Sequence, residues 1–281
     1  MVQEITQNFV KKLLPKRDPW SHKGDFGKLL IIGGSHKYSG APSLSAIAAY
    51  RAGCDLVEVA APERAADIIA TFSPDLITHP LKGKLFNPSH VKHLLSLSEE
   101  ADAVVIGSGL GREKPTLSAV KQFLRKNKKP VVIDADAIHA IHDFKLPERS
   151  ILTPHSKEFF TLTKNPLSRS VKQRGQQVRG IARTLSTVIL LKGHIDFISD
   201  GYKTAVNRTG NPYMTKGGTG DTLSGICGAL LSQGNSEFDS ACAAAYINGA
   251  SGDLAFGEFG PAMLASDILF SMMDFRKELK T

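Results

Sequence analysis

The stretch "KGGTGDTLSG", from Lys216 to Gly225, combines closely spaced glycines with a single aspartate, Asp221. Glycines let backbone N–H groups approach an anion closely, and several converging N–H groups form an anion-binding nest. A carboxylate beside such a nest can take or orient the proton of an attacking hydroxyl while the nest holds charge on a transferring phosphoryl group. The stretch therefore indicates phosphoryl transfer. The alternative is a turn followed by a simple helix cap.

A helix is expected directly after these glycines. Apolar residues recur at i, i+3, i+4, i+7 and i+8, and Gly234 follows them: Leu223, Ile226, Cys227, Leu230 and Leu231. Gly217 to Gly220 therefore lie just ahead of a helix N-terminus, where unpaired amides and the helix dipole favour an anion. Together with Lys216, these residues are here called the anion loop. The loop is not a Walker A motif, because G-x-x-x-x-G-K-[ST] is absent, and no G-x-G-x-x-G follows the first expected strand.

The elements that must position this loop are mostly alternating strands and helices. Several expected strands are apolar nearly throughout, which is typical of strands covered on both faces in a parallel sheet. They are Lys28–Ile32, Leu56–Ala60, Ala103–Ile106, Pro130–Asp134, Ile151–Thr153 and Thr187–Leu191. The sequence thus predicts an α/β fold with a mainly parallel central sheet and helices on both faces.

Helices lie between these strands, as at Pro42–Ala52, which Gly53 follows. The runs Asp196–Ser199 and Lys203–Val206 flank the turn signal Asp200-Gly201, so an antiparallel hairpin is expected near one edge. The final third is expected to be helical, at Asp221–Gln233, Ser240–Ala255 and Pro261–Phe275. No repeat or linker interrupts residues 1–281, which indicates one domain.

Composition narrows the class of protein. The 281 residues are 42% hydrophobic and carry a formal net charge of +8. This charge favours phosphorylated small molecules as ligands, with a merely solvated basic surface as the alternative. Nucleic acid is not expected, because no run of five or six Lys/Arg occurs. The three cysteines lack C-x-x-C spacing, and no 18-residue apolar stretch or signal peptide is present, so a cytoplasmic protein without a membrane segment is expected.

The N-terminal residues 1–20 are expected to form a helical extension. Apolar residues fall at helical spacing ahead of Pro15: Val2, Ile5, Phe9, Val10, Leu13 and Leu14. This pattern predicts a short amphipathic helix that packs on its own domain or on a neighbouring subunit rather than on a membrane.

Several segments together resemble the NAD(P)H-hydrate dehydratases, from about residue 20 to 270. They occur in the family's order: "HKGDFGKLLIIGGS", "YSGAPSLSA", "GSGLGR", "VVIDADAI", "ILTPHSKEF", "LLKGHIDFI" and "GNPYMTKGGTGDTLSG". The resemblance implies a ribokinase-like fold, similar to sugar and vitamin kinases, with the site at the carboxyl ends of the strands. The 281 residues leave no room for the epimerase domain that is fused to some relatives.

The resemblance also implies a repair reaction. A nucleotide phosphorylates the ring hydroxyl of the S-form hydrate of NADH or NADPH, phosphate leaves, and the ring double bond returns. Microbial members generally use ADP and animal or yeast members ATP, with Mg²⁺ in either case, so ADP is expected here, with AMP and phosphate as products.

The family's functional residues map onto this sequence position by position. Asp221 matches the aspartate at the substrate hydroxyl, and Gly218 and Gly220 match the phosphate-holding loop. The positions that match the hydrate pocket are Ala41, Gly109, Gly111 and His155. The positions that match the nucleotide segment are Lys192, Gly193, His194, Ile195 and Asp196, with Gly220 also at the nucleotide. Each has a plainer alternative: a solvated lysine, a structural histidine or small turn residues.

Further polar residues are weaker candidates. Glu158 matches an acidic position that is often linked to Mg²⁺ through water. Asp134 is a candidate for contact with substrate or metal, as is Asp136, for which shaping the turn at the strand end is the favoured alternative. Asn211 is a candidate support of the anion loop.

The sequence departs from the family pattern at a few positions. Asp196 replaces a threonine of many relatives, Ser156-Lys157 replaces Pro-Gly, His139 replaces Asn and Tyr213 replaces Gly. A carboxylate at Asp196 would repel phosphate unless it points away.

Two other functions are compatible with the anion loop. A kinase of a hydroxymethylpyrimidine, a hydroxyethylthiazole or a sugar would use the same loop and aspartate, and a non-catalytic nucleotide-binding regulator would keep the loop without turnover. Family members commonly form tetramers, and a separate epimerase would be a pathway partner.

Overall fold

The computed structural model describes residues 2–279. Its strands are β1 (Val2–Glu4), β2 (Lys28–Ile32), β3 (Leu56–Pro62), β4 (Ile77–Leu81), β5 (Ala103–Ile106), β6 (Val131–Ile133), β7 (Ser150–Leu152), β8 (Val188–Leu191), β9 (Asp196–Ser199) and β10 (Thr204–Asn207). Its α-helices are α1 (Gln7–Leu13), α2 (Gly40–Arg51), α3 (Glu63–Phe72), α4 (Val91–Glu100), α5 (Lys114–Lys126), α6 (Ser156–Thr163), α7 (Val171–Leu185), α8 (Thr219–Ser232), α9 (Glu237–Phe259) and α10 (Ala265–Glu278). Short 3₁₀ helices are η1 (Pro88–His90), η2 (Ala135–Ala140), η3 (Pro212–Met214) and η4 (Gly260–Ala262).

One sheet carries the strands in the order β1-β10-β9-β8-β7-β6-β5-β2-β3-β4. Neighbours from β4 to β8 pair in parallel, as the sequence predicts. The expected hairpin is confirmed, because β9 pairs antiparallel with both β8 and β10. The carboxyl ends of the parallel strands therefore meet at one edge of the sheet.

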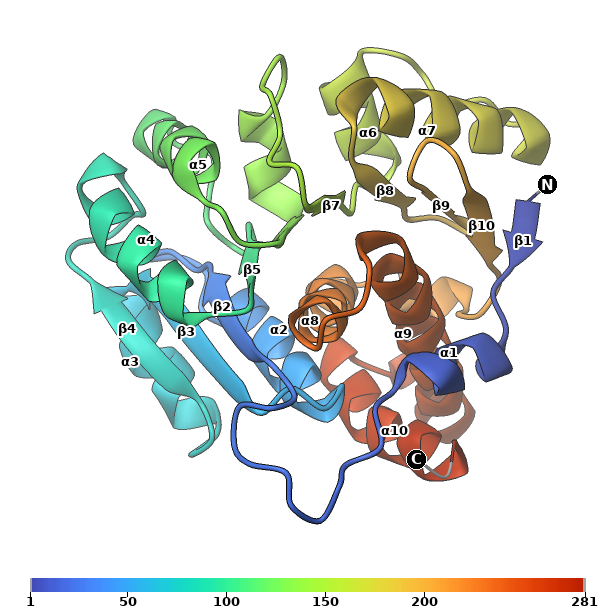
Figure 1. Cartoon of the computed structure of the whole chain (residues 1–281), viewed down its shortest axis with the longest axis horizontal. Helices are drawn as coiled ribbons and strands as arrows, with labels where there is room; N and C mark the ends of the chain where they lie inside the picture. The colour runs from blue at the N-terminus through green and yellow to red at the C-terminus, as the bar shows by residue number, and fades with distance from the viewer. Residues whose placement is uncertain (1, 280–281) are drawn as a thin grey trace.

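The central strands are apolar because both of their faces are covered. Along β2, Leu29 and Ile31 join one hydrophobic core while Leu30 and Ile32 join the other. Figure 1 shows α4, α5, α6 and α7 on one side of the sheet and α2, α8, α9 and α10 on the other. The helical final third is confirmed, and its helices α8, α9 and α10 lie on the same side of the sheet as α2.

The expected N-terminal helix is wrong over its first residues. Val2–Glu4 are extended and pair in parallel with β10, so they form an edge strand of the sheet. The helix starts only after Thr6, whose hydroxyl accepts a hydrogen bond from Phe9 N (3.3 Å) and caps it. Val10 is buried, and Phe9 and Leu13 pack on the core that contains α9, so the apolar side of α1 covers its own chain.

Strand β4 was not expected from the sequence. Its residues Ile77–Leu81 include His79 and Pro80, and their exposure is mixed rather than uniformly buried. The strand lies at the other edge of the sheet, next to β3 alone. Proline is tolerated there because an edge strand leaves one row of amides unpaired.

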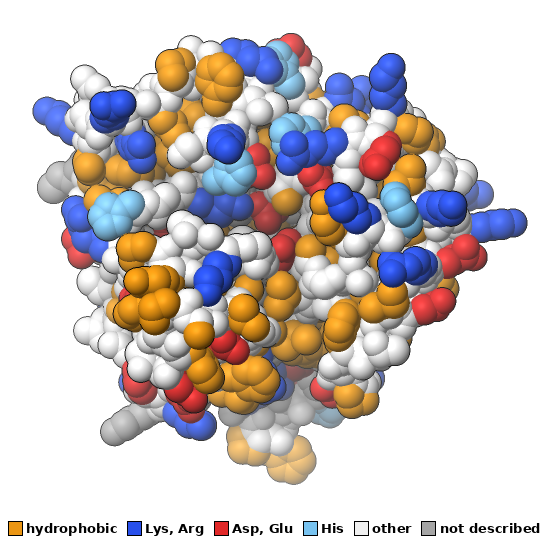
Figure 2. Space-filling view, turned by 180° about the vertical axis from the view of Figure 1, so that it is seen from behind, with side chains coloured by type: hydrophobic (Ala, Val, Ile, Leu, Met, Phe, Trp, Pro, Cys, Tyr) orange, Lys and Arg blue, Asp and Glu red, His pale blue; other side chains and the backbone are white. Residues whose placement is uncertain are grey.

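The positive charge is spread over the surface. Figure 2 shows Lys, Arg and His side chains distributed across one face, with Asp and Glu side chains between them. Within residues 2–279, no helix is both long and apolar enough to span a membrane.

Candidate active site

The candidate site lies where α8 begins, at the carboxyl ends of the parallel strands. Gly218 caps α8 with φ +103°, a left-handed conformation that glycine adopts without strain. A Cβ there would also stand 2.6 Å from Leu44 Cδ1. The first intrahelical bond runs from Thr222 N to Gly218 O (3.0 Å), so the amides of residues 219–221 lie at the open end of the helix. The helix begins two residues earlier than the sequence predicts, so Thr219 and Gly220 lie in its first turn rather than ahead of it.

Lys216 anchors the start of this loop. Its ammonium group donates to Pro261 O (2.9 Å) and to Met263 O, in the segment that joins α9 to α10. The loop is therefore fixed to the C-terminal helices at one end and to the first turn of α8 at the other.

Lys192 brings positive charge to the helix start. It follows β8, and its Nζ donates to Asp134 Oδ1 (2.9 Å) and lies 4.0 Å from Glu158 Oε2. Burial lowers its pKa, but the two carboxylates outweigh burial and raise it, so the ammonium group stays charged. A Cβ on Gly220 would lie 3.3 Å from Lys192 Nζ, which places this charge beside the anion loop.

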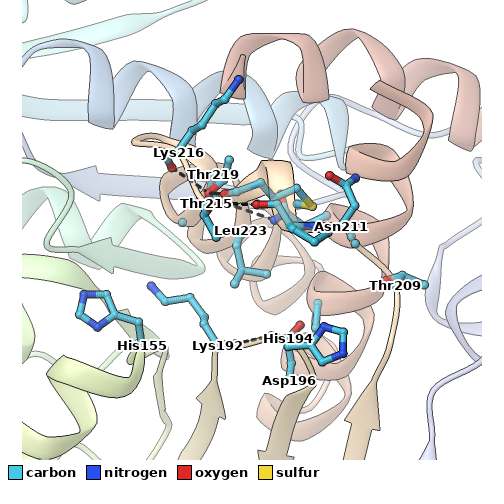
Figure 3. A pocket seen from close by; sticks show the side chains of 18 residues that line it. His155, Lys192, His194, Asp196, Thr209, Asn211, Thr215, Lys216, Thr219 and Leu223 are labelled. Atoms are coloured by element: carbon cyan, nitrogen blue, oxygen red, sulfur yellow. Dashed lines mark hydrogen bonds between the residues drawn. The ribbon is translucent and has the colours of Figure 1, made fainter. Parts of the chain in front are cut away.

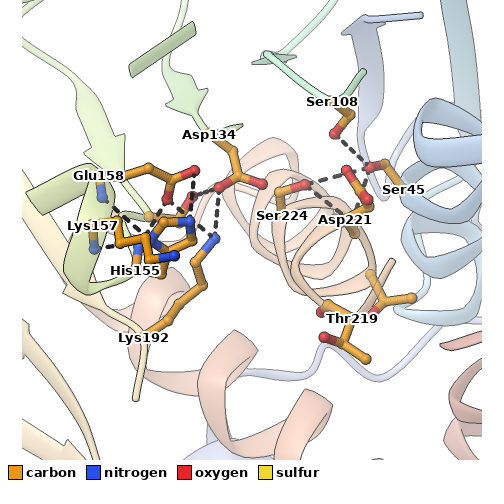
Figure 4. A network of polar contacts seen from close by, with 12 residues as sticks. Ser45, Ser108, Asp134, His155, Lys157, Glu158, Lys192, Thr219, Asp221 and Ser224 are labelled. Carbon is orange, nitrogen blue, oxygen red and sulfur yellow. Dashed lines mark hydrogen bonds and ion pairs between the residues drawn. The ribbon is translucent and has the colours of Figure 1, made fainter. Parts of the chain in front are cut away.

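Asp134 organises the end of β6 around this lysine. It is almost fully buried, and Thr153 Oγ1 donates to the same Oδ1 at 2.6 Å. Asp134 is therefore tied to Lys192 and Thr153 in this structure, as Figure 4 shows.

Asp221 sits in the first turn of α8, next to Gly220. Burial and the nearby Asp134 raise its pKa to about 6, against the lowering effects of a Ser108 hydrogen bond and of Lys192. A carboxyl group with this pKa is mostly ionised at neutral pH and still accepts a proton readily, which suits a general base.

His155 and Glu158 form a capping box at the start of α6. His155 Nδ1 accepts from Lys157 N (3.1 Å) and Glu158 N (3.2 Å), while Glu158 Oε2 accepts from His155 N (2.8 Å). Burial and the Lys192 charge lower the pKa of His155, so its ring is neutral with Nδ1 as acceptor. Burial raises the pKa of Glu158.

A cavity of about 620 Å³ opens beside the anion loop. Figure 3 shows that it lies between the end of β8, the loop after β10 and the start of α8. Of the positions predicted to bind nucleotide or hydrate, the structure brings these to its lining: His155, Lys192, Gly193, His194, Asp196 and Gly220. Ile195 does not line it, and its partly buried side chain packs against the hydrophobic core on the α4–α7 side of the sheet.

Three of the four positions that match the hydrate pocket, Ala41, Gly109 and Gly111, lie outside this cavity, whereas the fourth, His155, lines it. A Cβ on Gly109 would stand 3.3 Å from Ala41 Cβ, and Gly109 has φ +66°. Gly111 N donates to Asp136 Oδ2 (2.9 Å). Ala41, Gly109, Gly111 and Asp221 do not line the 620 Å³ cavity. The candidate residues therefore fall into two groups that meet at the first turn of α8.

Asp196 lines the cavity, but both of its carboxylate oxygens accept hydrogen bonds from this chain. Its Oδ1 accepts from Gly193 N (2.9 Å) and its Oδ2 accepts from Asn207 Nδ2 (3.0 Å), across the β9–β10 pair. Burial raises its pKa to about 6, against these two hydrogen bonds. Its carboxylate therefore braces the turn at residues 192–196.

Two other candidates also hold loops in place. Asp136 Oδ1 accepts from Arg112 Nε (2.7 Å), so Asp136 fixes the 107–112 loop as well as standing in η2. Asn211 Nδ2 donates to Gly252 O and Asp253 Oδ1 (both 3.0 Å), which ties the segment ahead of the anion loop to α9.

Sequence reasoning missed a set of buried polar side chains. Ser45 of α2, Ser108 after β5 and Ser224 of α8 surround Asp221, and Asn207 connects Asp196 to Thr209 and to α9. Serines in an apolar helix pattern look like small packing residues. Only the position of Ser108 inside "GSGLGR" gave a signal.

A mainly parallel sheet with an anion loop and a carboxylate at its carboxyl edge defines a ribokinase-like α/β protein. A ribokinase-like superfamily protein from Enterococcus faecalis has the same fold, with a TM-score of 0.86 at 25% identity, covering 99% of this chain and 96% of that one. The chain belongs to the NAD(P)H-hydrate dehydratase family, whose model matches residues 29–273.

Named relatives agree with this assignment. The chain is 45% identical over 251 residues to the bifunctional NAD(P)H-hydrate repair enzyme of Pyrobaculum aerophilum, covering 89% of this chain and 50% of the relative. It therefore spans about half the length of this relative. It is 37% identical to the ADP-dependent (S)-NAD(P)H-hydrate dehydratase of Cenarchaeum symbiosum, over 94% of this chain and 93% of the relative.

A solved structure is similar over nearly its full length. The ADP/ATP-dependent NAD(P)H-hydrate dehydratase of Bacillus subtilis, co-crystallised with ATP and Mg²⁺, has a TM-score of 0.87 at 30% identity and 99% coverage of both chains. Family, fold and site geometry are thus consistent with one another.

Proposed function

We propose that this chain dehydrates the S-form hydrate of NADH or NADPH in an ADP-dependent reaction that yields NAD(P)H, AMP and phosphate. The proposal rests on the family, and on the activity for which the Cenarchaeum symbiosum relative is named, which the chain matches over most of both lengths. We propose residues 1–281 as one functional unit, with β1 and α1 packed on the rest.

The positions of two neighbouring residues decide which reactant we assign to which side of the start of α8. Gly220 and Asp221 are neighbours in the first turn of α8, yet Gly220 lines the 620 Å³ cavity and Asp221 stands beside the Ala41–Gly109 group. We assign the nucleotide to the cavity and the hydrate to the other side. The transferring phosphoryl group then crosses the helix N-terminus, where amides and Lys192 stabilise its charge.

The proposed reaction has two stages, phosphoryl transfer and elimination. Asp221 takes the proton of the ring hydroxyl as its oxygen attacks the β-phosphorus of ADP, and AMP leaves. The ring nitrogen lone pair then expels phosphate, and loss of a proton from the neighbouring ring carbon restores the double bond. Phosphate is a far better leaving group than hydroxide, which explains why a nucleotide is consumed.

The residues fit a magnesium ion that is held chiefly by the nucleotide. Mg²⁺ retains several waters and is usually bound through one or two carboxylates and substrate phosphates. Within residues 2–279, no group of three or more His, Cys, Asp or Glu is placed to hold a metal. Glu158 would contact such an ion through water, because Oε2 already accepts from His155 N. The ion would supply charge neutralisation at the phosphates.

The test is direct. Purified chain is mixed with the prepared hydrate and Mg²⁺, with ADP or ATP in parallel, and absorbance at the reduced-nicotinamide band is followed. Recovery with ADP, faster than with ATP, supports the proposal. A flat trace with both nucleotides overturns it, and a stable phosphorylated product would favour a kinase instead. ADP binding without turnover of any alcohol would favour a regulator.

We also propose a homo-oligomer, with a tetramer as the expected form. Large apolar side chains are exposed close together in sequence, at the end of α9, at the residue before α10 and on α10: Phe259 (42%), Leu264 (58%) and Phe270 (59%). Light scattering of the wild-type chain and of Leu264→Glu tests this. We further propose a separate epimerase as pathway partner and a cytoplasmic setting, in keeping with three buried free thiols.

A further inference from the structure

The peptide group between Thr219 and Gly220 lies in the first turn of α8. Its C=O belongs to Thr219 and points along the helix, and its N–H belongs to Gly220 and points out of the open end. A peptide group is planar and trans, so its C=O and N–H bonds point in opposite directions. Whatever holds the Thr219 carbonyl therefore also sets the direction of the Gly220 N–H.

Gly220 has no side chain that could hold this peptide group. A Cβ there would lie 3.3 Å from Lys192 Nζ, which is closer than a Cβ normally approaches another atom. The glycine thus leaves room for the lysine charge beside the helix start. Glycine also has more backbone freedom than any other residue. The peptide group before Gly220 therefore needs a restraint from elsewhere in the chain.

Asn248 of α9 supplies such a restraint. It is 6% exposed and lines the cavity. Its Nδ2 donates to Thr219 O (3.2 Å), and its Oδ1 accepts from Thr222 Oγ1 (2.7 Å). The amide cannot be turned over, because Oδ1 would then face the Thr219 carbonyl oxygen, and neither oxygen has a proton to donate. The donor that meets this carbonyl is therefore an N–H of Asn248.

The other contacts of Thr219 leave this hydrogen bond intact. The Thr222 hydroxyl has one proton and two acceptors within reach, Asn248 Oδ1 and Thr219 O (2.8 Å). With either choice, Asn248 Nδ2 still donates to Thr219 O. On the loop side, Thr219 Oγ1 lies 2.8 Å from Met214 O and 3.1 Å from Lys216 O, and it donates its one proton to these carbonyls. Thr219 is thus held from α9 and from the anion loop.

We propose that Asn248 is a positioning residue for the anion loop: by donating to Thr219 O, it directs the Gly220 N–H toward the phosphates of the nucleotide. A hydrogen bond to a carbonyl also polarises its peptide group, which makes the N–H of that group a stronger donor. The role in turnover rests on the proposed function, whereas the direction of the Gly220 N–H does not. Asn248 acts through Gly220 and is not offered as a group that touches the reacting atoms.

A direct contact between Asn248 and the nucleoside is the competing role. The amide has a second N–H, and Asn248 lines the cavity together with Ala245 and Gly249 of the same helix. The two roles differ in the part of the ligand that a mutation affects. A misdirected Gly220 N–H weakens the binding of phosphates, whereas a lost contact to the nucleoside weakens adenosine as much as ADP.

The first experiment compares the affinities of ADP and adenosine by calorimetry, with adenosine measured through its displacement of ADP. Asn248→Leu should weaken ADP by about tenfold and adenosine by less than about twofold, because only ADP loses a hydrogen bond to a charged group. Asn235→Leu is the matched control, since its amide donates to Leu230 O (2.9 Å) near the other end of α8. The control should leave both affinities unchanged. Equal losses for ADP and adenosine, or no loss for ADP, overturn the inference.

The second experiment observes the Gly220 amide itself by NMR. Threonine labelled with ¹³C at the carbonyl and glycine labelled with ¹⁵N select Thr–Gly peptide groups, of which the sequence has two, ending at Gly210 and Gly220. Gly210 N donates to Asp253 Oδ2 (2.8 Å), so Asp253→Asn identifies its signal. The Gly220 signal should move downfield on saturation with ADP in the wild type and should move less in Asn248→Leu. An equal movement in both proteins overturns the inference.

Failure of the proposed function would give a different result. A wild type that binds ADP and never turns over the hydrate defeats the proposed function, and the ADP and adenosine affinities still decide on Asn248. A wild type that does not bind ADP overturns both. If Asn248→Leu does not fold, Asn248→Ala removes the same donor without adding atoms. It should show the same difference between ADP and adenosine, and equal losses in this folded variant would also overturn the inference.

Discussion

The ammonium group of Lys192 lies 2.9 Å from the buried carboxylate of Asp134 and beside Gly220. One cation therefore contacts both the carboxyl end of β6 and the anion loop. Lys192 is 20% exposed, whereas Asp134 is 2% exposed. The lysine can therefore be approached from the cavity, and Asp134 cannot. This arrangement makes the two residues separable by mutation.

Lys192→Met should weaken ADP binding by about tenfold to a hundredfold, because a charge-assisted contact to phosphate is lost. It should also lower the free energy of unfolding by about 3 kcal/mol, since Asp134 is left buried without its partner. Calorimetric titration and urea denaturation measure the two effects. The double variant Lys192→Met with Asp134→Asn should regain much of the stability but none of the affinity. Unchanged ADP affinity in Lys192→Met would place the phosphates elsewhere.

Asp221→Asn should reduce kcat by about a thousandfold or more while ADP affinity stays within about threefold, because the amide cannot accept the hydroxyl proton. Wild-type kcat/KM should fall as pH drops through about 6, the pKa of Asp221, since the base must be ionised. Stopped-flow or steady-state assays across pH measure both. Undiminished turnover would show that another group is the base.

The same aspartate should lower stability at high pH. Its folded pKa of about 6 lies above the ordinary value of 3.8, so its contribution to stability is fully present below about pH 4 and is lost as pH rises through 6. Asp221→Asn lacks this penalty. The free energy of unfolding of Asp221→Asn, relative to that of the wild type, should therefore be on the order of 2 kcal/mol higher at pH 8 than at pH 4.5. Urea denaturation of both proteins at both pH values measures the difference. An equal change of the unfolding free energy with pH in the two proteins would refute the prediction.

Asp196→Ala should raise the KM for ADP by about fivefold to tenfold with little change in kcat, because Gly193 N and Asn207 lose their common acceptor. Asp200→Ala is the matched control: its carboxylate braces the other end of the same hairpin, accepting from Tyr202 N (2.8 Å) and Lys203 N (2.6 Å). The control should leave KM unchanged. Equal KM values in both variants would mean that the 192–196 turn does not depend on Asp196.

Gly225→Ala should destabilise the protein by about 3 kcal/mol or more, because a Cβ on α8 would overlap the Ser45 carbonyl of α2. Gly180→Ala is the control, since this exposed helical glycine of α7 has nothing within 4 Å of its Cβ position. It should gain up to about 1 kcal/mol. Thermal denaturation compares them. A stable Gly225→Ala would mean that α2 and α8 can separate without cost.

The parallel strands could be predicted because both of their faces are buried, which requires apolar residues at nearly every position. Leu29 to Ile32 alternate between two hydrophobic cores, so no polar residue interrupts the run. The edges are harder to predict. Val2–Glu4 are exposed and form a strand only by pairing with β10, and β4 contains His79 and Pro80. Edge strands depend on a neighbour rather than on their own pattern.

The residues of the candidate site also differ in how far the sequence predicts them. Gly218, Gly220, Asp221 and Lys192 could be proposed from motifs, because phosphate chemistry restricts residue type, and the structure brings them together at the start of α8. Ser45, Ser108 and Asn207 could not, because their roles come from contacts between segments far apart in sequence. His155 and Glu158 illustrate a third case: both stand where expected, and the structure adds that they cap α6 together.

Under the proposed assignment of the two reactants, the division of Gly220 and Asp221 between two sides of one helical turn would set a rule for inhibitor design. A compound that imitates both reactants needs a diphosphate mimic on the Gly220 side, a nicotinamide-like ring on the Asp221 side, and a linker short enough to pass the tip of α8. Scaffolds that only fill the cavity would compete with the nucleotide alone.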